Sequence, residues 1–184
     1  MTVVPKIAAV AFGSHAALSF ASIGAGTFFT RSRAKWPSSS QALSTPTAHQ
    51  SNICKIVAGI YSGLGINPTL CTNDITFEDP VALCCGPAEV VEAFRALRAA
   101  HPEHVVQPRL HVHTDDPYSA VILMHQRYFG WLVVHSTLHV RFEPTGHISG
   151  LEERWNAVPL LHTLRPIRRL NGMLSSVLTP LLVR

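Results

Sequence analysis

The chain has 184 residues, which is long enough for one domain with a hydrophobic core and short for two. Hydrophobic residues make up 47% and charged residues 14%, a composition that excludes disorder over the whole chain. Residues 1–73 hold five basic residues and no acidic one, and they account for the formal net charge of +4. Residues 74–184 hold ten basic and eleven acidic residues, so the predicted folded part is nearly neutral and no nucleic-acid partner is expected.

Residues 1–51 are a leader that we expect to lie outside the fold. Ile7–Phe29 carries no formal charge, basic residues follow at 31, 33 and 35, and the Ser/Thr/Pro/Gln-rich stretch 37–51 has nothing to hold it folded. The lack of acidic residues favours a transit peptide for a mitochondrion or plastid. The alternatives are a membrane anchor, a secretory signal or a misread gene start, the last of which would leave a cytoplasmic protein.

Helical spacing and turn signals alternate over the first part of the fold. Apolar residues at helical spacing predict a helix over Ile53–Leu64. A short strand is expected at Ile75–Phe77, because Pro80 forbids further ladder pairing soon after it. Gly86-Pro87 begins a second helix that ends at His101-Pro102. Its inner face is expected to hold Val90, Val91, Phe94 and Leu97.

After residue 102 the hydrophobic period changes from helical to two. Strands are predicted at His104–His113, Ser119–Phe129, Trp131–Phe142 and His147–Trp155. In the third of these, one face is predicted to hold Leu132, Val134, Leu138, Val140 and Phe142, broken only by Ser136. The opposite face holds Trp131, His135, Thr137, His139 and Arg141. Two helices followed by long strands with tight turns predict an α+β fold in which a curved antiparallel sheet wraps around the N-terminal helices as a cone with a pocket.

The segment 161–184 is predicted to be an amphipathic C-terminal helix. Arg165, Arg168 and Arg169 stand near its start, and apolar residues recur at helical spacing after them. Most simply this helix packs on the domain or on a second subunit, which would make a homodimer. A basic amphipathic helix can also lie on an anionic membrane, so membrane contact through this helix or through the leader is the alternative.

Short motifs at both ends of the fold resemble a known family. Asp74–Pro80, Cys84–Gly86 and Val90–Phe94 look like the front of SnoaL-like domains in the nuclear-transport-factor-2-like superfamily. Gly146–Ile148 and Glu152–Asn156 look like their final strand, and the chain is most similar to a group of uncharacterised eukaryotic SnoaL-like proteins. The resemblance implies one SnoaL-like domain over residues 52–160, with ligands entering the cone and an acid or base on its wall. Cys85 stands where these relatives tend to have Arg, and Leu151 stands where they tend to have His.

Asp79 is the first candidate for a catalytic residue. The turn at Pro80 would hold its carboxylate at the rim of the pocket. The alternative is that Asp79 only accepts backbone N–H bonds within the turn, as Asp residues commonly do.

Glu152 and Glu153 are adjacent, so on a strand only one of them can point into the cavity. Arg154 shares the face of Glu152, and Trp155 shares the face of Glu153. An inward Glu beside Trp would have a raised pKa that suits a general base. An arginine partner would instead keep the carboxylate ionised and structural. We also regard His135, Arg154, Trp155 and Asn156 as candidates for binding in the pocket.

The predicted sheet carries an unusual number of histidines. They are His111, His113, His125, His135 and His139. No HExxH or comparable signature is present, so we expect no metal site. A single histidine, His125 or His135, is a candidate for the acid/base partner of a carboxylate.

The four cysteines show no CxxC spacing and are expected to be free thiols in a reducing compartment. The alternative is that the adjacent Cys84 and Cys85 form a reactive pair. No GxSxG motif, P-loop or dinucleotide fingerprint is present, so no cofactor is expected.

Two functions are therefore considered. The first is a non-catalytic SnoaL-like pocket domain that binds a small apolar ligand or a protein partner, and the sequence favours it because Cys85 and Leu151 remove polar groups. The second is a cofactor-independent isomerase, hydratase or cyclase that uses a pocket carboxylate with a histidine. An enzyme needs a carboxylate and a hydrogen-bonding partner inside a roomy pocket, whereas a cone plugged by apolar side chains with the acids outside would exclude catalysis.

Overall fold

A computed structural model describes residues 46–111, 116–156 and 159–182 of the chain, so most of the leader lies outside the described residues. The helices are α2 (Ala48–Gly59), α3 (Gly86–Ala99) and α4 (Arg165–Leu182), with short helical turns at Ile60–Leu64, Pro68–Leu70 and His162–Leu164. The strands are β1 (Cys71–Glu78), β2 (Leu83–Cys85), β3 (Glu103–His111), β4 (Ser119–Tyr128), β5 (Leu132–Phe142) and β6 (Ile148–Trp155). The order of elements is α+β, as predicted.

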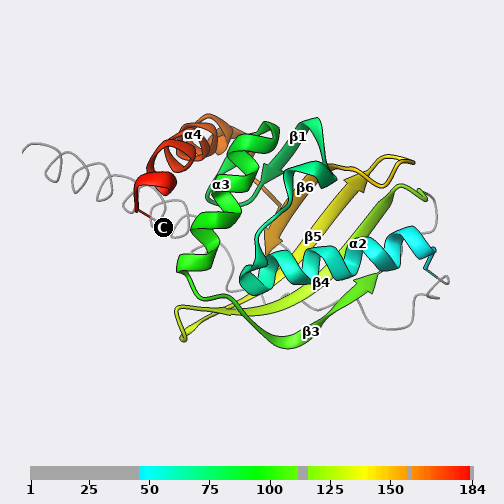
Figure 1. Cartoon of the computed structure of the whole chain (residues 1–184). Coiled ribbons are helices and arrows are strands. Elements are labelled where there is room, and N and C mark those ends of the chain that lie inside the picture. The colour runs from blue at the N-terminus through cyan, green and yellow to red at the C-terminus, as the bar shows by residue number, and fades with distance from the viewer. Residues whose placement is uncertain (1–45, 112–115, 157–158, 183–184) are drawn as a thin grey trace, which may run out of the picture.

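The six strands form one open, curved sheet in the order β2-β1-β6-β5-β4-β3. Figure 1 shows α2 and α3 on the same face of this sheet, with α4 beside α3 at one end. Neighbouring strands are antiparallel except for β1 and β6, which are parallel. The curved sheet that was predicted as antiparallel is therefore mixed, with one parallel pair. The two strands are far apart in the chain, so no hairpin imposes an antiparallel direction on them.

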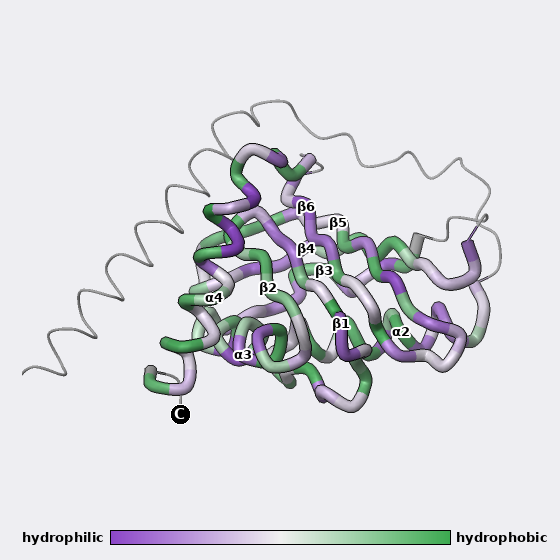
Figure 2. The backbone as a smooth tube through the Cα atoms, turned by 90° about the horizontal axis from the view of Figure 1, so that it is seen from above, coloured by the Kyte–Doolittle hydropathy of each residue, from purple (hydrophilic) through white to green (hydrophobic). Residues whose placement is uncertain are grey.

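Strand β2 is absent from the sequence prediction because a strand of three residues is too short to show a period of two. It follows the turn at Asp79-Pro80 and pairs back onto β1, with Phe77 opposite Cys84. Figure 2, seen from above, shows α3, α4 and β2 gathered at the same end of the molecule. This end of the sheet also holds the cavity described below.

Helix α2 begins at Ala48, earlier than the predicted start at Ile53. Thr47 and Gln50 form a capping box in which Thr47 Oγ1 accepts from Gln50 N at 3.1 Å and Gln50 Oε1 accepts from Thr47 N at 2.9 Å. Gln50 is buried, and its Nε2 donates to Ser119 O at 3.1 Å. The prediction that nothing holds residues 37–51 folded is therefore wrong for Ala48–Ser51.

The predicted alternation of β5 is confirmed. Its inner face holds Val134, Ser136, Leu138, Val140 and Phe142, which are all buried. Trp131 and Arg141 on the other face are exposed, and His135, Thr137 and His139 are partly buried. The inward residues pack beneath α2 and α3, and this packing is the reason for the α+β arrangement.

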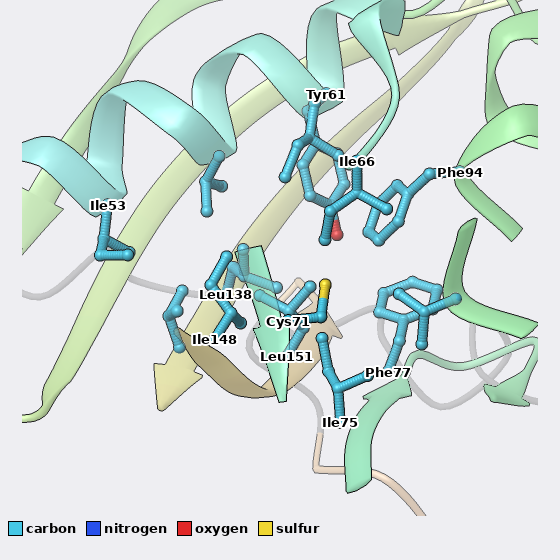
Figure 3. Packing of buried hydrophobic residues seen from close by; sticks show 14 of the residues in the cluster. Ile53, Tyr61, Ile66, Cys71, Ile75, Phe77, Phe94, Leu138, Ile148 and Leu151 are labelled. Carbon is cyan, nitrogen blue, oxygen red and sulfur yellow. The ribbon is translucent and has the colours of Figure 1, made fainter. Parts of the chain in front are cut away.

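The core is centred on aromatic contacts between the helices and β1 (Figure 3). Phe94 of α3 lies edge-on to Tyr61, with ring centroids 5.4 Å apart, and 4.8 Å from the ring centroid of Phe77 on β1. Val90, one turn earlier on α3, is fully buried, while Val91 and Leu97 pack partly buried against the core. The predicted inner face of α3 is thus confirmed.

Among the described helices, none combines the length and the apolar character needed to cross a bilayer.

Candidate functional site

A cavity of about 320 Å³ lies between α3, the β1–β2 turn, the β4–β5 hairpin and α4. Its wall is mainly apolar, with ionisable and hydroxyl groups at only a few positions. The polar and aromatic lining residues are Tyr61, Phe77, Asp79, Phe94, Tyr128, Phe129, Glu153, Trp155 and Ser175. A concave apolar site with a few convergent polar groups is typical of small-molecule binding sites.

Glu153 is the most deeply buried acid of this wall, with 2% of its surface exposed. Tyr61 Oη donates to Glu153 Oε2 at 2.8 Å, and Trp155 Nε1 donates to Glu153 Oε1 at 3.0 Å. Of the two adjacent glutamates, β6 thus turns Glu153 into the cavity together with Trp155. The carboxylate and its hydrogen-bonding partners lie inside a roomy pocket.

Burial, and then the negative charge of Asp79, raise the pKa of Glu153 to about 7. The hydrogen bonds from Tyr61 and Trp155 act in the opposite direction but do not outweigh the loss of solvation. A carboxyl group with a pKa near neutrality can both accept and donate a proton under physiological conditions.

Asp79 is held by the tight turn between β1 and β2. Its Oδ1 accepts from Val81 N at 2.7 Å and from Ala82 N at 2.6 Å. Asp79 therefore accepts backbone N–H bonds within the turn and also lies on the cavity wall, two roles that the sequence offered as alternatives. Burial raises the pKa of Asp79 to about 6, although the two backbone hydrogen bonds and the charge of Arg168 lower it.

Two tyrosines stand beside the acids. Tyr61 is 1% exposed and Tyr128 is 5% exposed, and both line the cavity. Burial, and then the charge of Glu153, raises the pKa of each phenol well above its ordinary value, so both stay protonated and can donate hydrogen bonds. The Tyr128 hydroxyl donates to Gln126 Oε1, and Gln126 Nε2 donates to Tyr61 O at 3.3 Å.

Glu152 and Arg154 lie on the opposite face of β6. Arg154 Nε donates to Glu152 Oε1 at 2.7 Å, and both side chains are partly exposed. The arginine-paired glutamate considered from the sequence is thus Glu152, and the glutamate beside tryptophan is Glu153. Neither Glu152 nor Arg154 lines the cavity.

The histidine candidates, His125 and His135, lie away from the cavity that holds Asp79 and Glu153. His125 and His135 face each other across β4 and β5, with rings stacked at 4.0 Å between centroids, and neither lines the cavity. Burial, and then the neighbouring His135 and Arg127, lower the pKa of His125. Asn156 also lies outside the cavity wall, where its backbone N donates to His135 O at 2.6 Å.

The two departures from the family pattern leave the cavity unaffected. Leu151 is buried in the core, Cys85 is exposed, and neither lines the cavity. All four cysteines are free thiols. Burial, and then the nearby acids Asp79 and Glu89, raise the pKa of Cys84 to about 12, which argues against a reactive Cys84–Cys85 pair.

Within residues 46–111, 116–156 and 159–182, no three His, Cys, Asp or Glu side chains are grouped closely enough to hold a metal ion. His113 and the side chain of His111 lie outside the described residues.

The sequence interpretation missed the two phenols. The apolar spacing of the predicted helix Ile53–Leu64 includes Tyr61 only as a core residue, and Tyr128 is included only in the predicted strand Ser119–Phe129. A buried tyrosine usually finds a hydrogen-bond partner, so a Tyr on a predicted core face is the signal that could have identified them.

No family model matches the chain, and no curated protein matches it by sequence. Among solved structures, the chain is similar to the epoxide hydrolase/cyclase-like enzyme SalBIII, described in pyran ring formation in the polyether salinomycin. The identity is 20%, 58% of this chain and 93% of that chain are covered, and the TM-score is 0.47.

A second similar structure is an NTF2-like protein of unknown function from Cytophaga hutchinsonii, at 10% identity, with 62% and 94% of the two chains covered and a TM-score of 0.46. A steroid delta-isomerase from Pseudomonas aeruginosa is similar at 18% identity, with 73% and 91% covered and a TM-score of 0.43. The architecture described above is an α+β fold in which an open, curved sheet carries two helices on one face.

Proposed function

We propose that this protein is a cofactor-independent enzyme that transfers a proton within a small, mostly apolar and uncharged substrate, as an isomerase does. The observation that carries the proposal is the pair of acids, Asp79 and Glu153, on the wall of an apolar cavity. Their pKa values of about 6 and about 7 mean that the pair holds about one proton between about pH 6 and pH 7. One carboxyl group can then act as a base while the other acts as an acid.

The proposed reaction follows from these protonation states. The ionised carboxylate removes a proton from a carbon next to a carbonyl group. The C–H electron pair forms the C=C bond of an enolate, and the carbonyl π pair moves onto the oxygen. The protonated carboxyl, or a phenol of Tyr61 or Tyr128, donates a hydrogen bond to this oxygen, on which negative charge develops. In a β,γ-unsaturated ketone, return of the proton to the γ-carbon moves the double bond and restores the carbonyl, which completes an isomerisation without any cofactor. The acidic partner here is a carboxyl or phenol, rather than the histidine expected from the sequence.

The exchange of substrate C–H for solvent deuterium tests this proposal without knowledge of the natural substrate. Small cyclic ketones are incubated with the full chain in D₂O, and loss of the α-proton signals is followed by NMR. We expect exchange above the buffer rate with the wild type and a loss of about 100-fold or more with Glu153→Gln. Glu152→Gln is the matched control, because its side chain lies on the other face of β6.

A non-catalytic ligand-binding domain is the second candidate. One observation favours it: both oxygens of Glu153 already accept hydrogen bonds, from Tyr61 and Trp155, as expected for a structural acid. In that case the ketones would shift the indole resonance of Trp155 on binding, while no α-proton would exchange faster than in buffer. This result would contradict catalysis and support the binding function.

A further inference from the structure

Helix α4 has the reverse of the usual orientation of an amphipathic helix. The side that packs on the domain is mainly polar and holds Arg168, Asn171, Ser175 and Thr179, which are all buried, together with the buried Leu178. The side turned to solvent holds a run of large apolar residues, which we call the α4 stripe: Ile167, Leu170, Met173, Val177 and Leu181. Their exposed fractions range from 40% to 70%. A surface helix normally buries such a stripe, so this stripe indicates an interaction surface.

Specific contacts fix this orientation. Arg168 is 2% exposed, and its Nη2 donates to Glu78 Oε1 at 2.7 Å and its Nη1 to Leu161 O at 3.0 Å. Asn171 Nδ2 donates to Val81 O at 2.9 Å. Gly172 lies against the backbone of β2, where an added Cβ would be 2.2 Å from Leu83 O. Rotating α4 to bury the stripe would break these hydrogen bonds and leave Glu78 and Arg168 unpaired.

The charges around the stripe argue against a lipid or nucleic-acid partner. Arg169 makes two hydrogen bonds to the carboxylate of Glu89, at 2.6 and 2.8 Å, and Arg165 Nε lies 3.6 Å from Glu78 Oε2. The arginines that make the sequence of this helix basic are therefore engaged with acids of the domain. Attachment to an anionic membrane relies on free cations beside the apolar face, and in the described part of α4 the stripe itself carries no charge.

We propose that the α4 stripe docks on the same stripe of a second copy of this chain. An uncharged apolar stripe is complementary to itself, and a two-fold contact between identical surfaces is the commonest way in which soluble chains assemble. The stripe covers four turns of helix, or roughly 20 Å. Two such helices packed together bury on the order of 1,000 Å², the lower limit of a specific interface. The expected complex is a dimer that dissociates at about micromolar concentration.

The dimer would also hold in place the part of the cavity wall that α4 forms. Ser175 of α4 lines the cavity from the buried side of the helix, two residues from Met173 and two from Val177 on the stripe. Contact with a second copy would hold this wall of the cavity in place. This consequence applies whether the cavity serves catalysis or binding, so the dimer does not depend on the proposed reaction.

The first experiment measures the mass of the full chain in solution over a range of concentrations by sedimentation or light scattering. We expect a monomer–dimer equilibrium for the wild type and a weakening of at least 100-fold with Val177→Glu, because two buried carboxylates would then meet across the axis. Leu64→Glu is the matched control: Leu64 is 80% exposed and lies outside the stripe. Equal melting temperatures of the two variants would show that Val177→Glu folds.

A second experiment identifies the partner surface directly. Leu170→Glu/Val177→Glu and Leu170→Lys/Val177→Lys are each expected to be monomeric, and an equimolar mixture of the two is expected to regain the dimer through opposite charges. The mixture regains the dimer only if the α4 stripe of one copy contacts the α4 stripe of the other.

Three results would overturn the proposal. One is a wild type that is monomeric up to high micromolar concentration, as expected if the apolar leader segment Ile7–Phe29 covers the stripe. Another is a wild type that is monomeric in solution but floats with phosphatidylcholine/phosphatidylserine vesicles, which would make a lipid surface the partner. The last is a dimer that survives Val177→Glu and dissociates with Leu64→Glu.

Discussion

The two faces of β6 place the same residue type in opposite environments. Glu153 points into the cavity, is 2% exposed and has a pKa raised to about 7. Glu152, the preceding residue, points outward and is paired with Arg154 at 2.7 Å. The pleat of the strand separates them, because successive side chains point to opposite faces. The difference teaches that the chemistry of a carboxyl group in this fold depends on the face of the sheet and not on the local sequence.

The same contrast applies to the wider sheet. The inner face collects Asp79, Glu153 and two phenols around an apolar space, whereas the outer face carries His125, His135 and the Glu152–Arg154 pair near solvent. Substitutions on the inner face should therefore change activity and pH dependence, and matched substitutions on the outer face should change neither.

The largest effect is expected for Asp79→Asn, measured as the rate of deuterium exchange into a ketone. The amide oxygen can still accept from Val81 N and Ala82 N, so the turn is kept while the ionisable group is lost. General acid–base groups contribute about 10²–10⁴-fold, and we expect a fall of roughly 10²–10³-fold. Asp74→Asn, at an exposed position of the preceding strand β1, should change the rate less than about two-fold. A rate for Asp79→Asn above half that of the wild type would exclude Asp79 from the reaction.

The next largest effect is expected in how the free energy of unfolding changes with pH, because Glu153 is buried. The pKa of Glu153 is about 7 in the folded state and about 4.5 in the unfolded state, so folding favours its protonated form. This contribution is complete below pH 4.5 and is lost as the pH rises through 7, and Asp79 acts in the same direction. Ionised Glu153 thus costs roughly 3 kcal/mol at about pH 8.

Thermal melts between about pH 5 and pH 8 measure this difference. We expect the wild type to lose stability as the pH rises, and Glu153→Gln to lose much less and to be the more stable protein at the upper end. Glu152→Gln should follow the wild type. Parallel curves for all three proteins would mean that Glu153 is solvated in solution.

A smaller effect is expected for Tyr61→Phe, which removes the donor to Glu153 Oε2. The loss of one buried hydrogen bond to a charged acceptor should cost about 1.5–3 kcal/mol. The pKa of Glu153 should rise further, because this hydrogen bond lowers it, and the pH profile of exchange should shift upward. Tyr118→Phe is the control: its ring is 45% exposed and would keep its edge-on contact with Phe142. An unchanged pH profile of exchange for Tyr61→Phe would show that the Tyr61 phenol does not affect the pKa of Glu153.

The smallest effect is expected for His125→Gln on the outer face. Its ring stacks on His135 away from the cavity, so stability should change by less than about 0.5 kcal/mol and exchange by less than about two-fold. Denaturant unfolding and the exchange assay measure the two quantities. A ten-fold loss of exchange would show that His125 takes part in the reaction. It would contradict the claim that only residues of the inner face affect activity.

Much of the secondary structure could be predicted because it depends on local periodicity. The alternation of Val134, Leu138 and Val140 identified β5 and its buried face, and Gly86-Pro87 marked the start of α3. The parallel pairing of β1 with β6 could not be predicted, since it depends on contacts between distant segments. The start of α2 was missed although its capping box, Thr47 with Gln50, is a local signal. Only the bond from Gln50 to Ser119 depends on a distant segment.

The sequence alone also limited the candidate site to a few residues. It showed that only one of Glu152 and Glu153 can enter the cavity, and that the inward glutamate would have a raised pKa beside Trp155. It could not show that Tyr61 and Asp79 lie beside this glutamate, because they belong to other elements. The arginines of α4 likewise predicted a basic surface, but Glu78 and Glu89 turn Arg168 and Arg169 toward the domain.

The sequence by itself determined the α+β class, the faces of the strands and the short set of candidate acids, because these follow from periods of two and 3.6 along one chain. Only the tertiary structure decided which glutamate is buried, which phenols donate to it and which side of α4 faces solvent. Each of these depends on loss of solvation and on charges supplied by residues distant in the chain, and neither is encoded in a local pattern.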